Sequence, residues 1–168
     1  MELDVPASVR SLLLLTNSGS RRALEIRLQL ESYLIDLPDT IEIIWKDVFT
    51  SPDPHLTTDR AVIVGGDGTV NLGLSWLKSS GLDVPVALVP AGTGNNLARG
   101  LGIPIEPAKA IELAFCTEET RCIDSVQLTY DEKTTGMMLQ VAAAGMPALV
   151  AQRFDRLRHM PILSHPVR

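Results

Sequence analysis

The chain has 168 residues, of which 45% are hydrophobic, and a formal net charge of −5 at pH 7. This length is enough for one ordinary domain, or for one domain and part of another. The acidic pI of about 5.1 argues against general nucleic-acid binding. The apolar run at residues 12–15 is too short for a signal peptide or a membrane span. We therefore expect a soluble, cytoplasmic protein.

Strand-like and helix-like segments alternate through residues 1–120. Short apolar runs predict buried strands, and segments with apolar residues three or four positions apart predict helices. We expect strands at residues 11–16, 41–45, 60–64 and 83–89, and helices at residues 21–37, 70–80, 95–101 and 106–116. Residues 49–58 hold two prolines and no helical period, so we expect a loop there. This alternation predicts an α/β fold, an open Rossmann-like parallel sheet with flanking helices.

The pattern changes near residue 120. Residues 121–129 and 137–144 predict two strands joined by a polar turn at residues 131–136, which is typical of an antiparallel hairpin. We therefore expect an α/β domain over residues 1–120 and the beginning of an incomplete β-rich domain over residues 121–168, with the apolar run at 137–150 as its opening strand. A hairpin without further strands has an exposed edge, which favours a homodimer.

Two glycine-rich motifs each follow a predicted strand and lead into a predicted helix. The first is GGDGTVN at residues 65–71, and the second is PAGTGNNLA at residues 90–98. Glycines let a backbone approach a phosphate closely, and the free N–H groups at the start of a helix point towards it. Asn17 and Ser20 follow the first strand at the same edge of the sheet, where open α/β sheets bind ligands, and Ser20 stands where it can cap the helix that follows. The sequence therefore predicts one polyphosphate held between these loops.

In the first motif, we expect Gly65, Gly66 and Gly68 to form the turn that approaches the phosphates. Thr69 stands where a helix N-cap or a phosphate-contacting hydroxyl belongs. Asp67 is the unusual member, because a carboxylate among phosphates is repelled unless a cation stands between them. We interpret Asp67 as a Mg²⁺ ligand, direct or through water; the alternative is that it caps a turn.

In the second motif, Gly92, Thr93 and Gly94 form another cradle, in which the threonine hydroxyl can donate to a phosphate or ribose oxygen. Asn95 and Asn96 can fix the loop or reach the ligand. The sequence contains no GxxxxGK[ST] motif, so it has no Walker-type site. It also contains no Ser-His-Asp or Cys-His set, and we assign no catalytic residue within this chain.

The paired motifs resemble those of the diacylglycerol kinase catalytic-domain family, which includes bacterial lipid kinases and sphingosine kinases. Residues 65–71 match the family pattern GGDGT(V/I)NE, and residues 92–98 match GTGNDFA. Residues 101–104 match the usual continuation, residues 17–20 resemble a degraded NPxSG, and residues 122–124 resemble the crossing into a second domain. The resemblance covers essentially the whole chain.

The resemblance implies ATP and Mg²⁺ as cofactors and transfer of the γ-phosphoryl group to a lipid hydroxyl at a membrane surface. By motif match, the nucleotide contacts would be Asn17, Ser20, Thr50, Gly66, Asp67, Gly68, Thr69, Asn71 and Thr93. The same match implies that Asp67 and Asp124 belong to a water-linked Mg²⁺ site, in which Asn96 can act as a neutral ligand.

Three positions depart from the family pattern. Leu72 replaces the expected glutamate, Asn96 replaces the expected aspartate, and Ser18 replaces the expected proline. Family members are also about twice as long, and their second domain carries the general base and much of the lipid site. The resemblance therefore implies a chain that is the ATP-binding half of a lipid kinase and is incomplete by itself.

Two other interpretations remain open. The first is a naturally short module that binds nucleotide without catalysis, which Leu72 and Asn96 favour. The second is an enzyme like NAD kinase or phosphofructokinase that uses GGDGT with another acceptor, and the segment at residues 92–104 argues against it.

Overall fold

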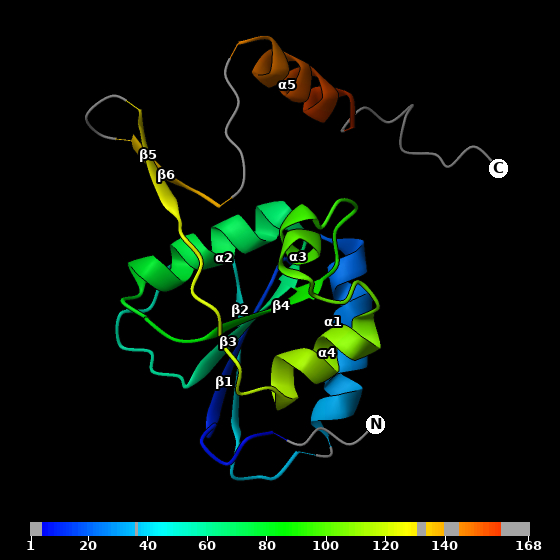
Figure 1. The fold of residues 1–168 in the computed structure, drawn as a ribbon, viewed down its shortest axis with the longest axis vertical. Coiled ribbons are helices and arrows are strands. Elements are labelled where there is room, and N and C mark those ends of the chain that lie inside the picture. Colours follow the sequence, from blue (N-terminus) through cyan, green and yellow to red (C-terminus); the bar gives the residue numbers. More distant parts are fainter. Residues whose placement is uncertain (1–4, 36, 131–133, 140–144, 159–168) are drawn as a thin grey trace, which may run out of the picture.

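The computed structural model of the chain describes residues 5–35, 37–130, 134–139 and 145–158. Four parallel strands form one sheet in the order β2-β1-β3-β4. The strands are β1 (Ser11–Thr16), β2 (Glu42–Asp47), β3 (Arg60–Gly65) and β4 (Val86–Pro90). The flanking helices are α1 (Arg21–Leu34), α2 (Asp67–Ser79), α3 (Asn96–Leu101) and α4 (Pro107–Cys116). The predicted open parallel sheet with flanking helices is confirmed (Figure 1).

Helices cover both faces of this sheet (Figure 1). Side chains alternate along a strand, so Leu12 and Leu14 of β1 pack with α1 and α4, whereas Leu13 and Leu15 pack with α2 and α3. All four leucines have 0% exposure. A strand buried on both faces is a continuous apolar run, which is why the sequence identifies β1 without any alternation.

The helix and strand bounds differ from the predicted ones at several ends. The first helix stops at Leu34 instead of residue 37, because the residue before Pro38 is disfavoured in the helical conformation. The second helix begins at Asp67 instead of residue 70. The glycine motif thus supplies the first turn of α2, where an acidic residue is favourable next to the positive end of the helix dipole.

The last part of the chain contains β5 (Val126–Tyr130), β6 (Thr134–Met138) and α5 (Met146–Arg158). The strands pair in antiparallel fashion, as predicted, but β6 begins inside the predicted turn. Residues 140–144, predicted as strand, lie outside the described residues. The boundary near residue 120 stays a prediction.

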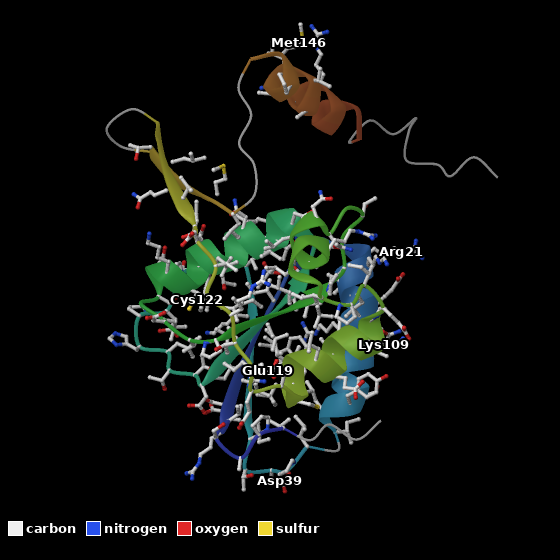
Figure 2. The ribbon with its side chains drawn as sticks, viewed as in Figure 1. Arg21, Asp39, Lys109, Glu119, Cys122 and Met146 are labelled. Carbon is white, nitrogen blue, oxygen red and sulfur yellow. The ribbon has the colours of Figure 1, made fainter. Side chains whose placement is uncertain are left out.

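The expectation of a strand continuing to residue 150 is wrong, because α5 begins at Met146. Gly145 precedes it with φ of +72°, and Pro147 stands in the first turn, where proline is well tolerated. Short apolar runs do not distinguish strand from helix by periodicity. Met146 is 73% exposed and lies away from the parallel sheet (Figure 2). Over the residues described, no helix is both long and apolar enough to span a bilayer.

Arg60, the first residue of β3, is a buried charge that the sequence did not reveal. It is 7% exposed, and its Nη1 donates to the carbonyls of Ala114 and Phe115 at 3.0 and 3.1 Å. Its Nη2 donates to the Thr117 carbonyl at 2.7 Å. Burial lowers the pKa of the guanidinium. Arg60 therefore satisfies carbonyls at the end of α4 that have no partner within the helix.

We expect Arg60→Met to lower the free energy of unfolding by about 3 kcal/mol, because it keeps an apolar stem but leaves these carbonyls without donors. Urea denaturation measures this difference. Arg22→Met is the matched control, since Arg22 is exposed on α1 and its loss should change stability by less than about 0.5 kcal/mol. Equal unfolding midpoints for the two variants would contradict the capping role.

Candidate functional site

The candidate site lies at the carboxyl edge of the parallel sheet, the edge at which β1 to β4 all end. Parallel pairing brings the loops that follow these strands to the same edge. The loop at residues 17–20 follows β1, and the first glycine motif follows β3. The second glycine motif follows β4, the direct neighbour of β3. The topology therefore places the predicted phosphate loops together.

The two glycine motifs touch through their backbones. A Cβ added at Gly66 would lie 2.8 Å from the Gly92 Cα, and one added at Gly92 would lie 2.5 Å from the Gly66 Cα. Both distances are too short for real atoms, so only glycine permits this approach. The Ala91 N–H also donates to the Gly65 carbonyl at 3.0 Å. Gly65 itself packs against the buried side chain of Thr69.

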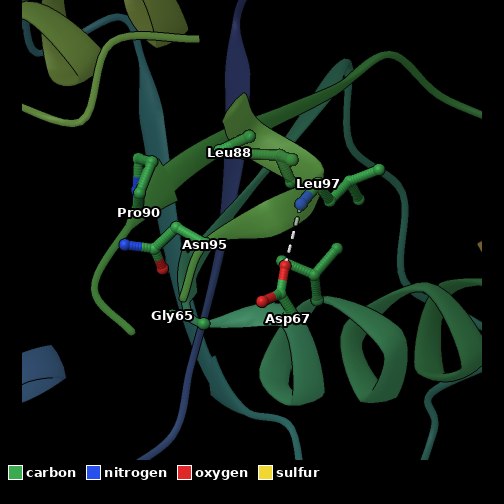
Figure 3. A pocket seen from close by; sticks show the side chains of 9 residues that line it. Gly65, Asp67, Leu88, Pro90, Asn95 and Leu97 are labelled. Atoms are coloured by element: carbon green, nitrogen blue, oxygen red, sulfur yellow. Dashed lines mark hydrogen bonds between the residues drawn. The ribbon is translucent and has the colours of Figure 1, made fainter. Parts of the chain in front are cut away.

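Asp67 joins the first motif to the second through its carboxylate. Its Oδ2 accepts from the Asn96 N–H at 3.1 Å. Its Oδ1 accepts from the Leu97 N–H at 2.9 Å, the bond drawn in Figure 3. These N–H groups begin α3, whose own N-cap residue makes no side-chain cap bond. Asp67 therefore caps the start of α3, the helix of the other motif, whereas the alternative interpretation expected it to cap a turn.

Asn95 holds the second motif in shape. Its side chain is 3% exposed; its Oδ1 accepts from the Gly92 N–H at 2.8 Å and its Nδ2 donates to the Gly92 carbonyl at 2.9 Å. Its φ of +50° lies in the left-handed region, which asparagine tolerates better than most residues. Asn95 therefore fixes the loop, while Thr93 and Gly94 are exposed.

The loop after β1 is built from local hydrogen bonds. Asn17 Oδ1 accepts from the Gly19 N–H at 2.9 Å, and Ser20 Oγ accepts from the Ala23 N–H at 3.3 Å. The predicted N-cap role of Ser20 is confirmed. Both side chains thus shape the loop, and their contact with a nucleotide stays a prediction.

Asp47, the last residue of β2, was not among the predicted site residues. Its Oδ2 accepts from the Ser18 N–H at 2.7 Å and its Oδ1 from the Phe49 N–H at 2.8 Å. Burial acts to raise the pKa of Asp47, but the hydrogen bonds from Ser18 and Phe49 outweigh it and hold the pKa below its usual 3.8. An acid two residues after the predicted strand at residues 41–45 was the available sequence indication.

Two further predicted residues are associated with α2: Thr50 is hydrogen-bonded to it, and Asn71 is part of it. Thr50 Oγ1 donates to the Asp47 carbonyl at 2.7 Å, and the Thr50 carbonyl accepts from Trp76 Nε1 at 2.9 Å. Asn71, on α2, has a buried Oδ1 that finds no hydrogen-bond partner in the described part of the chain. Buried polar atoms are nearly always paired, so this oxygen is free to accept a hydrogen bond close to the first motif.

A small hollow of about 10 Å³ lies between α2 and α3 (Figure 3). This is the lower limit for one water molecule. The hollow is lined by Gly65, Gly66, Asp67, Val70, Leu88, Pro90, Asn95, Leu97 and Ala98. A polyphosphate cannot enter it and would have to lie over the exposed loop surfaces, where Gly68 and Thr93 are open to solvent.

The predicted metal ligands are Asp67, Asn96 and Asp124. Within the described ranges, no three His, Cys, Asp or Glu side chains gather as a metal cluster. Both Asp67 oxygens accept an N–H, yet each keeps a second lone pair. Asn96 and Asp124 are exposed, the latter on the segment between α4 and β5. Of the three, the structure brings together Asp67 and Asn96 through the Asn96 N–H, and the Mg²⁺ site itself stays a prediction.

The sequence model described as "Diacylglycerol kinase catalytic domain" matches residues 12–128. A diacylglycerol kinase of Mycobacterium tuberculosis is 37% identical over 127 residues, which cover 71% of this chain and 40% of that protein. A YegS-like lipid kinase of Pseudomonas aeruginosa is 42% identical over 88 residues, or 50% of this chain and 28% of that protein. The chain thus spans about two fifths of the length of the M. tuberculosis relative.

Among solved structures, a diacylglycerol kinase from Bacillus anthracis superposes on the chain with a TM-score of 0.46 at 21% identity. The superposition covers 64% of this chain and 40% of that chain.

We expect Asp67→Ala to lower the free energy of unfolding by about 1–2 kcal/mol, because two N–H groups of α3 lose their acceptor. Amide hydrogen exchange should quicken at Asn96 and Leu97. Asp67→Asn keeps one acceptor oxygen, so its free energy of unfolding should lie between those of wild type and Asp67→Ala. Asp83→Ala, at an exposed position, is the control, and unchanged exchange at Leu97 in Asp67→Ala would contradict the cap.

The lowered pKa of Asp47 predicts a pH-dependent contribution to stability. A carboxyl with a depressed folded-state pKa stabilises the fold above its unfolded value and loses that effect as pH falls through the folded pKa. The melting-temperature gap between wild type and Asp47→Asn should therefore be larger at about pH 7 than at about pH 3. A gap that is constant or widens on acidification would refute this, and Asp83→Asn should show no gap at either pH.

Proposed function

Because this chain belongs to the diacylglycerol kinase catalytic-domain family, we propose that it is the ATP-binding part of a lipid kinase. The reaction is transfer of the γ-phosphoryl group of ATP to a lipid hydroxyl, with Mg²⁺, at the cytoplasmic surface of a membrane. The observation that carries this proposal is the joining of two glycine loops by the Asp67 carboxylate at the carboxyl edge of the sheet. Catalysis of phosphoryl transfer is mostly positioning and charge stabilisation, and preformed loops provide positioning.

The residues of this chain would hold the phosphates through backbone groups. α2 has 13 residues, and its first N–H groups have no partner within the helix, so its N-terminus favours an anion. Gly68 lies in that first turn, and Thr93 offers a hydroxyl from the second loop. Both are exposed, which allows a phosphate chain to lie over the two motifs.

Mg²⁺, when bound, neutralises charge on the phosphate oxygens. Asp67 would reach it through water, because its oxygens already accept from Asn96 and Leu97. Asn96 would contribute a neutral oxygen, and Asp124 would contribute a carboxylate from the following segment. We place the general base and most of the lipid site outside this chain, in keeping with its coverage of 40% of the M. tuberculosis relative.

The second candidate function is a nucleotide-binding module without catalysis. Leu72 favours it, because this apolar side chain is 41% exposed on α2 where the family pattern has a glutamate. Asn96 favours it too, since it removes one charge from the proposed Mg²⁺ neighbourhood. Phosphoryl transfer from radiolabelled ATP to diacylglycerol vesicles separates the two functions, provided the protein isolated from its native source is used and its intact mass is measured.

We expect the folded chain to bind Mg-ATP, and Gly68→Ala to weaken that binding about tenfold. A methyl group at Gly68 meets no atom within 4 Å, so folding is spared, but it obstructs the close approach of a phosphate to the backbone. Gly100→Ala is the matched control, because Gly100 is also exposed, helical and without neighbours.

Isothermal titration calorimetry measures both affinities. Absence of binding at millimolar Mg-ATP, in a sample shown to be folded, would overturn the proposed function. Equal Mg-ATP affinities of Gly68→Ala and Gly100→Ala would show that Gly68 does not contact the phosphates.

A further inference from the structure

Phe49 presents an aromatic ring to solvent beside the candidate site. It is 67% exposed, whereas Phe115 is fully buried at 0%. The chain has three phenylalanines and an aromatic content of 4%. A single exposed apolar side chain needs no explanation by itself, but this one lies at the carboxyl edge, two residues after the end of β2.

The backbone of Phe49 is joined to the loop after β1. The Asp47 carboxylate accepts from the Phe49 N–H at 2.8 Å through one oxygen and from the Ser18 N–H at 2.7 Å through the other. One carboxylate therefore holds the aromatic residue next to the loop at residues 17–20, which leads into α1.

The residues on either side of Phe49 are fixed as well. The Val48 N–H donates to the Thr16 carbonyl at 2.9 Å, and the Val48 side chain is 6% exposed. The Thr50 carbonyl accepts from the Trp76 indole at 2.9 Å. The ring is thus open to solvent on a backbone that is tied to β1, to α2 and to its own turn. Because this backbone is held before binding, only the rotation of the side chain itself remains to be ordered, which lowers the entropic cost of binding.

The strand order sets the position of this ring relative to the glycine loops. The sequence of strands is β2-β1-β3-β4, and neighbouring strands lie about 4.8 Å apart. The ends of β2 and β4 are therefore separated by about 14 Å along the edge. Phosphate-type loops follow β3 and β4, and the exposed ring follows β2 at the other end of the same row.

We propose that Phe49 is the stacking platform for the purine base of the nucleotide. The inference rests on the proposed function, because it assumes that the phosphates lie over the glycine loops. Aromatic side chains stack on bases through π-faces that every base possesses. The ring, the loop after β1 and the glycine motifs would then contact successive parts of one nucleotide along the edge.

The test compares ATP with inorganic tripolyphosphate, which has the phosphates but no base. In calorimetric titrations with Mg²⁺, Phe49→Ala should bind ATP about tenfold more weakly than wild type does, in line with the loss of one base–aromatic stack. Its affinity for tripolyphosphate should stay within about twofold of wild type. Phe49→Tyr keeps an aromatic ring and should bind ATP as wild type does, whereas Phe49→Leu should behave like Phe49→Ala.

Leu28→Ala is the matched control, because Leu28 is 68% exposed on α1 and should affect neither ligand. Melting temperatures of all variants should equal that of wild type, since the ring is exposed. Wild-type ATP affinity retained in Phe49→Ala would overturn the stacking role and leave the proposed function standing. Equal losses for ATP and tripolyphosphate, or full affinity in Phe49→Leu, would also overturn it. A wild-type chain that binds no ATP would overturn both.

Discussion

Two glycine motifs in different βα turns become one site because the Asp67 carboxylate accepts the first N–H groups of α3. Backbone contact between Gly66 and Gly92 brings the turns together, but glycines offer no side chain to hold them. The Asp67 carboxylate provides this link. Its negative charge also stabilises the positive N-terminal end of α3, a short helix whose own N-cap residue makes no side-chain cap bond. Asn95 then closes the second loop on itself, so both loops are shaped before any ligand arrives.

At two other places, a single charged side chain also binds several backbone groups. Asp47 binds N–H groups from two loops with one carboxylate, and Arg60 binds three carbonyls at the end of α4 with one guanidinium. Hydrogen bonds to charged groups are stronger than those between neutral groups. Loops around the buried sheet are therefore held by a few ionised side chains, while hydrophobic contacts on its two faces provide the main part of the core.

The position of the site follows from the sheet. β1 is central and buried on both faces, with β2 and β3 paired to it in parallel. Every loop at the carboxyl edge consequently begins from a rigid strand, and residues on such loops keep fixed positions relative to one another. Such an arrangement would suit the proposed phosphoryl transfer, which depends on placing phosphates, cation and acceptor in register. The exposed ring of Phe49 occupies one end of this row and the glycine loops occupy the other.

The amino-acid sequence determined the parallel sheet, the two phosphate-type motifs and the helix cap at Ser20, because each is encoded by local periodicity, glycine placement or side-chain chemistry. It did not determine that residues 146–158 form a helix, because a short apolar run fits either structure. Nor did it reveal the partners of Asp67, Asp47 and Arg60. Apart from the local bond between Phe49 and Asp47, those hydrogen bonds join residues 29 to 57 positions apart. Only the packing of strands and helices decides which distant N–H or carbonyl group a charged side chain meets.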